Sequence, residues 1–191
     1  MKVEASFLLS AARASDLPRD GLAEIAFVGR SNVGKSSLIN ALVRQAVART
    51  SGAPGKTRLA NIYRIARGGA DPFYLVDLPG FGYARGGAAS AREFEALTRA
   101  FFGREGPAAL LLVDARHPGL ASDREAWHWL QPTVERVAIV ATKIDKLARG
   151  ERIRALRELE SVFEMPVLPV SAATGEGLDD LWKLIAQLTS A

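Results

Sequence analysis

A stretch of glycine, lysine and serine residues near the start of the chain has the spacing of a phosphate-binding loop. Residues 29–36 read GRSNVGKS, which fits the pattern G-x-x-x-x-G-K-S, and they lie between an apolar run at 25–28 and a helix-like run at 37–43. In that context the glycines let successive backbone N–H groups point at phosphate oxygens, and the helix N-terminus adds a partial positive charge. Lys35 can then reach the β- and γ-phosphates, and the Ser36 hydroxyl can hold Mg²⁺. The pattern predicts that the chain binds a nucleoside triphosphate.

An acidic residue ends a second apolar run that could lie beside this loop. Asp77 closes the run at 73–77, and Gly80 follows shortly after it. A carboxylate at the end of a neighbouring strand can meet the Mg²⁺ of a phosphate loop through water, and the Gly80 N–H can then sense a γ-phosphate. The glycine-rich residues 81–87 are typical of a switch segment that three phosphates order and two phosphates loosen.

A threonine in residues 50–57 is the candidate for closing over Mg²⁺ and the γ-phosphate. We choose Thr57, because Pro54 and Gly55 supply hinge chemistry beside it and because it abuts the run at 59–66. Thr50 and Ser51 remain alternatives on spacing alone.

Two later segments carry groups that can recognise a purine base. Thr142, Lys143 and Asp145 follow one apolar run, and a Ser-Ala-Ala segment that begins at Ser171 follows another. A carboxylate in the base plane can accept hydrogen bonds from guanine N1–H and N2–H₂, whereas adenine has neither donor there. The Lys143 stem can lie over the purine, and the backbone N–H of Ala172 can donate to guanine O6. Since ligands bind at the carboxyl ends of strands in open α/β sheets, this order favours guanine.

Composition indicates the class of protein. The chain has 191 residues, of which 48% are hydrophobic and 24% charged, and this suits one globular domain. It contains no cysteine, so neither a disulfide framework nor a thiolate metal site is possible. The net charge of +4 permits contact with nucleic acid or a ribosome without establishing it. We expect a cytoplasmic protein that does not engage a membrane, because no apolar run approaches the ~20 residues of a membrane helix and no signal-peptide layout is present. We also expect a monomer.

Apolar runs alternate with helix-period segments, which predicts an α/β fold of three layers. We expect a mostly parallel six-stranded sheet with helices on both faces and one antiparallel edge strand, the more polar run at 59–66. Residues 1–22 are expected to be an N-terminal lead segment, and residues 23–191 the nucleotide-binding domain. The expected strands are Ala23–Val28, Leu59–Ala66, Phe73–Asp77, Ala108–Asp114, Val137–Thr142 and Val167–Val170.

Helix periodicity and capping signals locate four of the helices. Apolar residues repeat at helical spacing over 149–163 and 178–188. Two S-x-x-E capping boxes predict that further helices begin at Ser90 and Ser122.

Together these stretches resemble those of the EngB family, bacterial ribosome-biogenesis GTPases within the translation-factor-related P-loop GTPases. The matching stretches are GRSNVGKSSLINAL, PGKTR, VDLPGFGYA, LLVDARHPG, DREAWHWL, ATKIDKL and SAATGEGLDDLW. They extend from about residue 7 to residue 182, and VDLPGFGYA combined with LLVDARHPG is quite specific to the family. The resemblance implies the P-loop GTPase fold and a GTPase that acts as a switch in assembly of the large ribosomal subunit. It also implies a part in cell division and septation.

The resemblance assigns the family's site residues to positions of this sequence. Its Mg²⁺ ligands fall on Ser36 and Thr57, with Asp77 acting through water, and its γ-phosphate sensor falls on Gly80. Lys35, Thr57 and Gly80 are the residues expected to act in hydrolysis. The expected partners are guanine nucleotide, GTP or GDP, and a precursor of the large ribosomal subunit, through its rRNA or its proteins. The expected nucleotide contacts are Gly29, Arg30, Ser31, Asn32, Val33, Gly34, Lys35, Ser36, Ser37, Gly55, Thr57, Asp77, Gly80, Thr142, Lys143, Asp145, Ser171, Ala172 and Ala173.

Two positions depart from the wider GTPase pattern. Thr142 stands where most GTPases have Asn, which predicts a looser tie between the base loop and the phosphate loop. Phe81 stands where Ras-like proteins have the Gln that orients the attacking water, and a phenyl ring cannot do this. We therefore expect slow intrinsic hydrolysis. Related GTPases with Asn at the position of Asn32 use potassium, so K⁺ near Asn32, or the ribosome, is expected to raise the rate.

Three other functions remain open at this point. A nucleotide kinase would need a basic lid and an acceptor pocket, and the base-reading loops argue against it. An ATP-driven enzyme would be separated by competition between GTP and ATP. A scaffold that binds nucleotide and barely hydrolyses it is consistent with Phe81.

Overall fold

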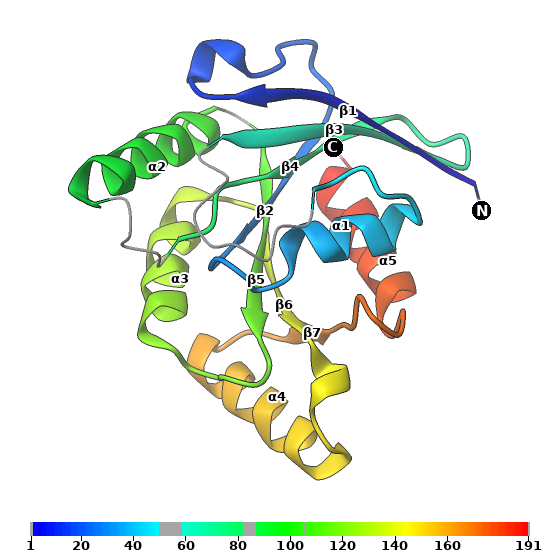
Figure 1. The fold of residues 1–191 in the computed structure, drawn as a ribbon, viewed down its shortest axis with the longest axis vertical. Coiled ribbons are helices and arrows are strands. Elements are labelled where there is room, and N and C mark those ends of the chain that lie inside the picture. Colours follow the sequence, from blue (N-terminus) through cyan, green and yellow to red (C-terminus); the bar gives the residue numbers. More distant parts are fainter. Residues whose placement is uncertain (1, 50–58, 82–86, 105, 191) are drawn as a thin grey trace.

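One sheet with helices on both faces makes up the fold (Figure 1). The computed structural model describes residues 2–49, 59–81, 87–104 and 106–190, and of residues 87–94 it describes the backbone alone. Within these ranges seven strands form a sheet in the order β1-β3-β4-β2-β5-β6-β7, so the predicted three-layer α/β architecture is confirmed. The strands are β1 (Val3–Ala11), β2 (Glu24–Gly29), β3 (Ala60–Arg67), β4 (Phe73–Asp77), β5 (Ala108–Asp114), β6 (Val137–Thr142) and β7 (Val167–Pro169).

The parallel strands bring several loops to one edge of the sheet. β4, β2, β5, β6 and β7 run parallel to one another, whereas β3 runs antiparallel to both β4 and β1. In this register Asp77 at the end of β4 lies opposite Phe27 of β2, and Asp114 at the end of β5 lies opposite Thr142 of β6. The segments that follow these strands therefore meet at the carboxyl edge, where ligands bind in open α/β sheets.

β1 corrects two expectations about the other end of the sheet. The sequence predicts six strands with residues 59–66 at the edge, but Val3–Ala11 of the expected lead segment pairs with β3 and makes β3 an interior strand. A register shift between Phe7 and Leu9 interrupts this pairing, and Phe7 and Leu8 are 54% and 43% exposed. The alternation of more buried and exposed positions along β1 is therefore broken in the middle, which weakens the pattern that identifies a strand in a sequence.

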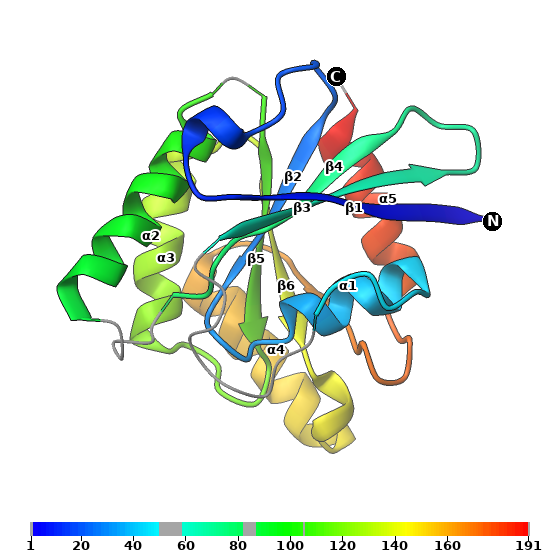
Figure 2. The same ribbon diagram turned by 45° about the horizontal axis from the view of Figure 1, so that its top comes forward.

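Helices cover the two faces of the sheet unequally, as Figures 1 and 2 show together. α1 and α5 pack on one face, and α2, α3 and α4 pack on the other. None of the helices in the described ranges combines the length and hydrophobicity that crossing a bilayer requires. The helices are α1 (Lys35–Val43), α2 (Gly87–Phe102), α3 (Ala121–Thr133), α4 (Arg149–Phe163) and α5 (Leu178–Thr189), with 3₁₀ turns at Ala14–Asp16 and Ile144–Lys146.

Hydrophobic periodicity predicted helix bounds better than the capping signals did. α4 and α5 have the predicted bounds to within one residue. α2 begins at Gly87, three residues before Ser90, so this predicted start was wrong, whereas α3 begins at Ala121, one residue before Ser122. In α3 the amides of Asp123 and Arg124 already donate to the Leu120 carbonyl at 3.0 and 3.1 Å, which places the S-x-x-E pattern inside the first turn.

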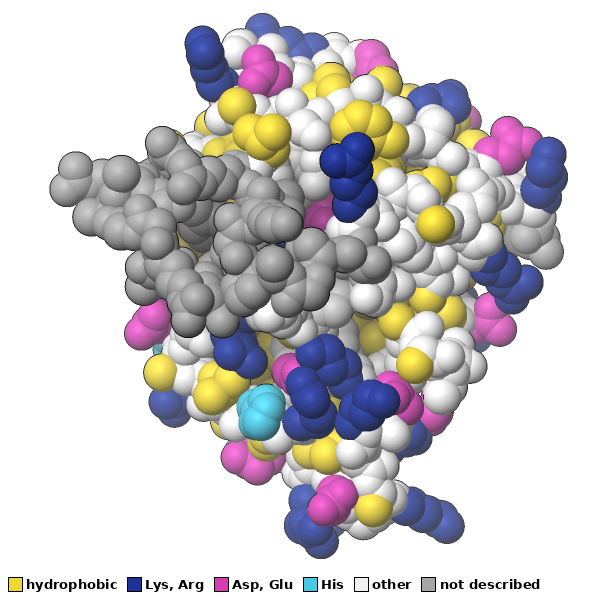
Figure 3. Space-filling view, in the orientation of Figure 1, with side chains coloured by type: hydrophobic (Ala, Val, Ile, Leu, Met, Phe, Trp, Pro, Cys, Tyr) yellow, Lys and Arg dark blue, Asp and Glu magenta, His cyan; other side chains and the backbone are white. Residues whose placement is uncertain are grey.

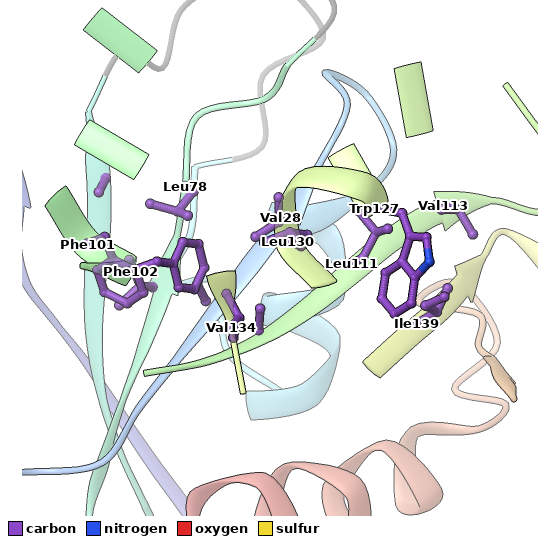
Figure 4. Packing of buried hydrophobic residues seen from close by; sticks show 14 of the residues in the cluster. Val28, Leu78, Phe101, Phe102, Leu111, Val113, Trp127, Leu130, Val134 and Ile139 are labelled. Atoms are coloured by element: carbon purple, nitrogen blue, oxygen red, sulfur yellow. The ribbon is translucent and has the colours of Figure 1, made fainter. Parts of the chain in front are cut away.

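β5 belongs to both hydrophobic cores. Every residue of β5 is buried, as expected for a central parallel strand. Leu111 and Val113 pack towards Trp127 and the α2–α3 side of the sheet (Figure 4). Leu112 packs on the opposite side, where α1 and α5 lie. The strand that underlies the phosphate loop is thus fixed from two directions.

Candidate nucleotide-binding site

The phosphate loop is a tight turn between β2 and α1 at which two glycines are required. A Cβ at Gly29 would lie 2.8 Å from Val33 Cγ1 and 2.9 Å from the Leu112 carbonyl oxygen, closer than packed atoms approach. Gly34, directly before α1, has a φ of +108°, which residues with a side chain rarely adopt. Gly29 is therefore required because there is no space for a side chain, and Gly34 because of its backbone conformation.

The Lys35 side chain folds back into this loop. It is only 9% exposed, and its Nζ donates to the Gly29 carbonyl at 3.2 Å and to the Arg30 carbonyl at 3.4 Å. Burial lowers the pKa of the Lys35 ammonium below its ordinary value, and the nearby Asp77 carboxylate opposes this shift. A buried cation is thus held at the mouth of a turn rich in backbone N–H groups.

Ser36 and Asp77 bring a hydroxyl and a carboxylate from different elements into contact. Ser36 Oγ donates to Asp77 Oδ2 at 3.0 Å, and Asp77 is 4% exposed. Burial raises the pKa of Asp77, against the opposing effects of Lys35 and the Ser36 hydrogen bond. Asp77 Oδ1 has no hydrogen-bond partner among the described residues.

These oxygens fit a Mg²⁺ ion that takes most of its ligands from nucleotide phosphates and water. Mg²⁺ prefers hard oxygen donors, and proteins bind it through one or two carboxylates together with phosphates and water. In the described ranges no three His, Cys, Asp or Glu side chains gather into a metal cage. The hydroxyl, the buried carboxylate and its orphaned oxygen are the donor set that such partial coordination requires.

Gly80 packs directly against the phosphate loop. A Cβ at Gly80 would lie 2.6 Å from the Ser31 amide nitrogen, so only glycine fits here. Next to this contact the Ser31 amide donates to the Phe81 carbonyl at 3.2 Å, and the Phe81 amide donates to the Gly29 carbonyl at 3.3 Å. The segment after Asp77 is thereby held beside the start of the loop.

Asp145 and Ser171 meet although they lie in separate loops. Ser171 Oγ donates to Asp145 Oδ1 at 2.7 Å and accepts from the Thr174 amide at 3.1 Å. The hydrogen bond from Ser171 is the main cause that lowers the pKa of Asp145, so this carboxylate is ionised at neutral pH. Its second oxygen, Oδ2, lies 3.5 Å from Lys146 Nζ. The pair presents an oriented carboxylate next to the half-buried Ala172 and the exposed Ala173.

Thr142 ties the base loop to the phosphate loop more firmly than expected. The sequence predicts a looser tie because Thr142 replaces Asn. However, Thr142 Oγ1 donates to the Val33 carbonyl at 2.8 Å and also lies 3.1 Å from the Val113 carbonyl oxygen. The shorter side chain suffices because Thr142 is buried directly beneath the loop.

Asp114 is a site residue that the sequence reasoning missed. Lys143 Nζ donates to the Asn32 carbonyl and lies 3.1 Å from Asp114 Oδ2. Burial alone would raise the pKa of Asp114, but hydrogen bonds from Arg116 and Lys143 outweigh it and lower the pKa to about 2. Asp114 ends a buried apolar strand, as Asp77 does, so the rule that found Asp77 could have found it.

Positive charge surrounds the base side of the site. Figure 3 shows Lys and Arg side chains gathered beside a His on one face of the molecule. Around Asp114 and Asp145 the ion-paired cations are Arg116, Lys143 and Lys146, of which Lys146 is the most exposed at 60%. This distribution suits an anionic ligand.

The described site residues converge on the carboxyl edge of the sheet. Ser37 lies exposed in the first turn of α1, and Asn32 lies exposed in the loop with a φ of +65°. Gly55 and Thr57, with the alternatives Thr50 and Ser51, lie outside the described residues.

Comparison with known proteins agrees with this geometry. A family described as 50S ribosome-binding GTPase matches residues 24–143. The chain is 43% identical over 190 residues to the probable GTP-binding protein EngB of Chlorobaculum tepidum, covering 97% of each chain. It is 39% identical over 186 residues to the EngB protein of Lacticaseibacillus casei, covering 94% of this chain and 92% of that one.

Solved structures of GTPases share the fold. A probable GTP-binding protein EngB superposes with a TM-score of 0.67 at 26% identity, over 87% of this chain and 98% of that chain. Era of Aquifex aeolicus bound to GDP and AlF₄⁻ superposes with a TM-score of 0.77 at 25% identity, over 89% of this chain and 57% of the Era chain. With a matching family model over most of its length and near full-length relatives, the chain belongs to the EngB family of GTP-binding proteins and is a GTPase.

Proposed function

We propose that this GTPase binds GTP and GDP together with Mg²⁺ at the site described above and acts as a molecular switch in assembly of the large ribosomal subunit. The Ser171–Asp145 hydrogen bond of 2.7 Å carries the proposal, because it orients a carboxylate for the base on the same edge as the phosphate loop. The proposal assigns the phosphates to the backbone amides of residues 29–37 and to Lys35. It assigns the guanine to Asp145, Lys143 and the Ser171–Ala173 loop, with Thr142 holding that side in place.

The metal site of the proposal uses Ser36 as a direct ligand and Asp77 through water, with Thr57 from the segment outside the described residues. The 3.0 Å contact between Ser36 and Asp77 supports this assignment. When bound, Mg²⁺ would neutralise charge on the β- and γ-phosphates.

Hydrolysis in the proposal rests on positioning and electrostatics. Lys35 and the N–H groups of the loop stabilise charge on the γ-phosphoryl group, and the Gly80 N–H adds a donor on that side. Thr57 is assigned to the same task. Phe81 cannot orient the attacking water, so intrinsic hydrolysis is slow.

The ribosomal partner is supported by the description of the matching family and by the net charge of +4. The part in cell division and septation that the resemblance implies belongs to the same proposal. We also propose that the chain works as a monomer. We place it in the cytoplasm, because a sequence without cysteine suits a reducing compartment.

Replacing Asp145 by Asn tests the choice of base. The substitution removes the negative charge and turns one of the two acceptor oxygens that face guanine N1–H and N2–H₂ into an NH₂ donor. Two charge-assisted hydrogen bonds are worth roughly 3–4 kcal/mol, or a factor of about 10²–10³. GDP affinity should fall by about that factor, while XDP, which has a carbonyl at C2, should gain affinity. Asp179→Asn, at an exposed position of α5, is the matched control. Unchanged GDP affinity in Asp145→Asn, measured by titration calorimetry, contradicts the assignment.

Replacing Ser36 by Ala tests the metal site. We expect the gain in GTP-analogue affinity on adding Mg²⁺, compared with EDTA, to shrink by about tenfold, because one oxygen ligand is lost. Ser37→Ala removes the neighbouring exposed hydroxyl and should keep the full gain. If both variants respond alike, Ser36 is not the ligand.

Potassium provides a test of what replaces the missing Gln. A monovalent cation near Asn32 would add positive charge where charge develops in the transition state. We expect GTP hydrolysis to be several-fold faster in KCl than in NaCl of equal ionic strength, and Asn32→Ala to abolish the difference. Equal rates in the two salts would end this part of the proposal.

The switch itself is tested by cosedimentation with purified ribosomal subunits. The chain loaded with a non-hydrolysable GTP analogue should sediment with large subunits, whereas the GDP-loaded chain should stay in the supernatant, because the γ-phosphate orders the switch segments. Small subunits are the control. Sedimentation that is independent of the bound nucleotide would contradict a switch.

A further inference from the structure

Asp123 is a buried carboxylate without a hydrogen bond. It lies in the first turn of α3, is 1% exposed, and neither of its oxygens has a hydrogen-bond partner among the described residues. Buried polar side chains are almost always hydrogen-bonded, so an exception needs an explanation.

The charge nearest to Asp123 comes from the phosphate loop. Arg30 Nε lies 3.4 Å from Asp123 Oδ1, and this Nε is also buried without a hydrogen bond. The two groups are close enough to attract each other but are not aligned as donor and acceptor. The ion pair is therefore loose in this structure, and a small movement of either element would tighten it.

The backbone of Arg30 links two parts of the site. Its carbonyl accepts from Lys35 Nζ at 3.4 Å and from the Val33 amide at 3.2 Å. Arg30 also forms a parallel bridge with Phe81, the residue directly after Gly80. Arg30 is thus connected through Phe81 to Gly80, the residue assigned to the γ-phosphate.

Asp123 is costly to the fold when it is ionised. Burial raises the pKa of Asp123 to about 6, Arg30 of the phosphate loop opposes this, and Asp114 of β5 adds to it. Because the pKa in the fold lies above the ordinary value of 3.8, the free energy of unfolding falls as the pH rises from about 4 through about 6. At neutral pH the carboxylate therefore does not stabilise the chain by itself.

We propose that Asp123 is a positioning residue, which holds the Arg30 guanidinium and thereby places Gly80 for the γ-phosphate, so that the pair strengthens binding of GTP relative to GDP. This inference rests on the proposed function. A ligand shifts an equilibrium only through its differential affinity for the two states. If the ion pair aligns fully only when a γ-phosphate holds Gly80, its energy contributes to triphosphate binding alone.

The test compares affinities for a non-hydrolysable GTP analogue and for GDP in Asp123→Asn, Arg30→Met and the double variant. We expect each single variant to lower the ratio of GTP-analogue affinity to GDP affinity by about tenfold, since one charged contact is lost. The double variant should lower it no further, because the two residues act as a unit.

A matched control separates positioning from stability. Glu24 begins β2, the strand that ends at the phosphate loop, and it pairs with Arg104 far from the site. Glu24→Gln should lower the melting temperature and leave the ratio unchanged. Asp123→Asn should leave the melting temperature at pH 7.5 unchanged or raise it.

The pH dependence gives an independent readout. As pH falls from 7.5 to 5.5, Asp123 gains a proton and loses its attraction for Arg30. The ratio of GTP-analogue affinity to GDP affinity of the wild-type chain should therefore fall towards the ratio of Asp123→Asn. The ratio of Asp123→Asn itself should change less over this pH range.

Each outcome bears on a different statement. The positioning inference is wrong if the wild-type chain and the variants have the same ratio of GTP-analogue affinity to GDP affinity. It is also wrong if the effects of the two single variants on this ratio add up in the double variant. If Asp123→Asn weakens both nucleotides equally, Asp123 serves only the fold. If the wild-type chain binds no guanine nucleotide, the proposed function fails first.

Discussion

The site depends on how closely separate stretches of backbone approach one another at the carboxyl edge of the sheet. Gly29 passes over β5 with no room for a Cβ, and Gly80 lies against Ser31 in the same way. Such contacts are possible only where side chains are missing, so they determine which residues can stand at these positions. Thr142 then bonds the Val33 carbonyl, which holds the base loop at a defined place relative to the phosphate loop. The distance between the two halves of the site follows from these contacts.

Buried charge concentrates at this edge and does little for stability. Burial lowers the pKa of Lys35 and raises the pKa of Asp77, which means that both charged forms are disfavoured by their surroundings. Asp123 behaves likewise, whereas Asp114 is compensated by Arg116 and Lys143. Violations of the usual burial rules are expected at functional sites. The edge of the sheet is thus arranged for a charged ligand at some expense to the fold.

Much of this architecture could be predicted from the sequence, because its signals are local. The apolar runs of β2, β4, β5 and β6 indicate buried parallel strands. The phosphate loop is a contiguous sequence motif, and its glycines stand where the backbone leaves no alternative. Asp77 and Asp145 were found because each follows an apolar run, and the structure places both at the expected edge.

The features that were missed depend on contacts between distant segments. The alternating pattern of β1 is broken at Phe7 and Leu8, and its place in the sheet comes from pairing with β3, a distant segment of the chain. The strength of the Thr142 tie depends on burial beneath Val33, and the Asp123–Arg30 pair joins α3 to the phosphate loop. No spacing in the sequence predicts either of these two contacts, because the residues of each contact lie far apart in the chain. Asp114 is different, because it follows the same rule as Asp77 and was overlooked.

Base selectivity of the wild-type chain is the measurement on which this account depends. GDP and ADP should be titrated into the purified protein under identical Mg²⁺ and salt. An ionised Asp145 held by Ser171 accepts from guanine and repels the lone pair of adenine, so GDP should bind at least about 100-fold more tightly. Equal affinities for GDP and ADP would contradict the account, since the loops after β6 and β7 would then have no part in choosing the nucleotide.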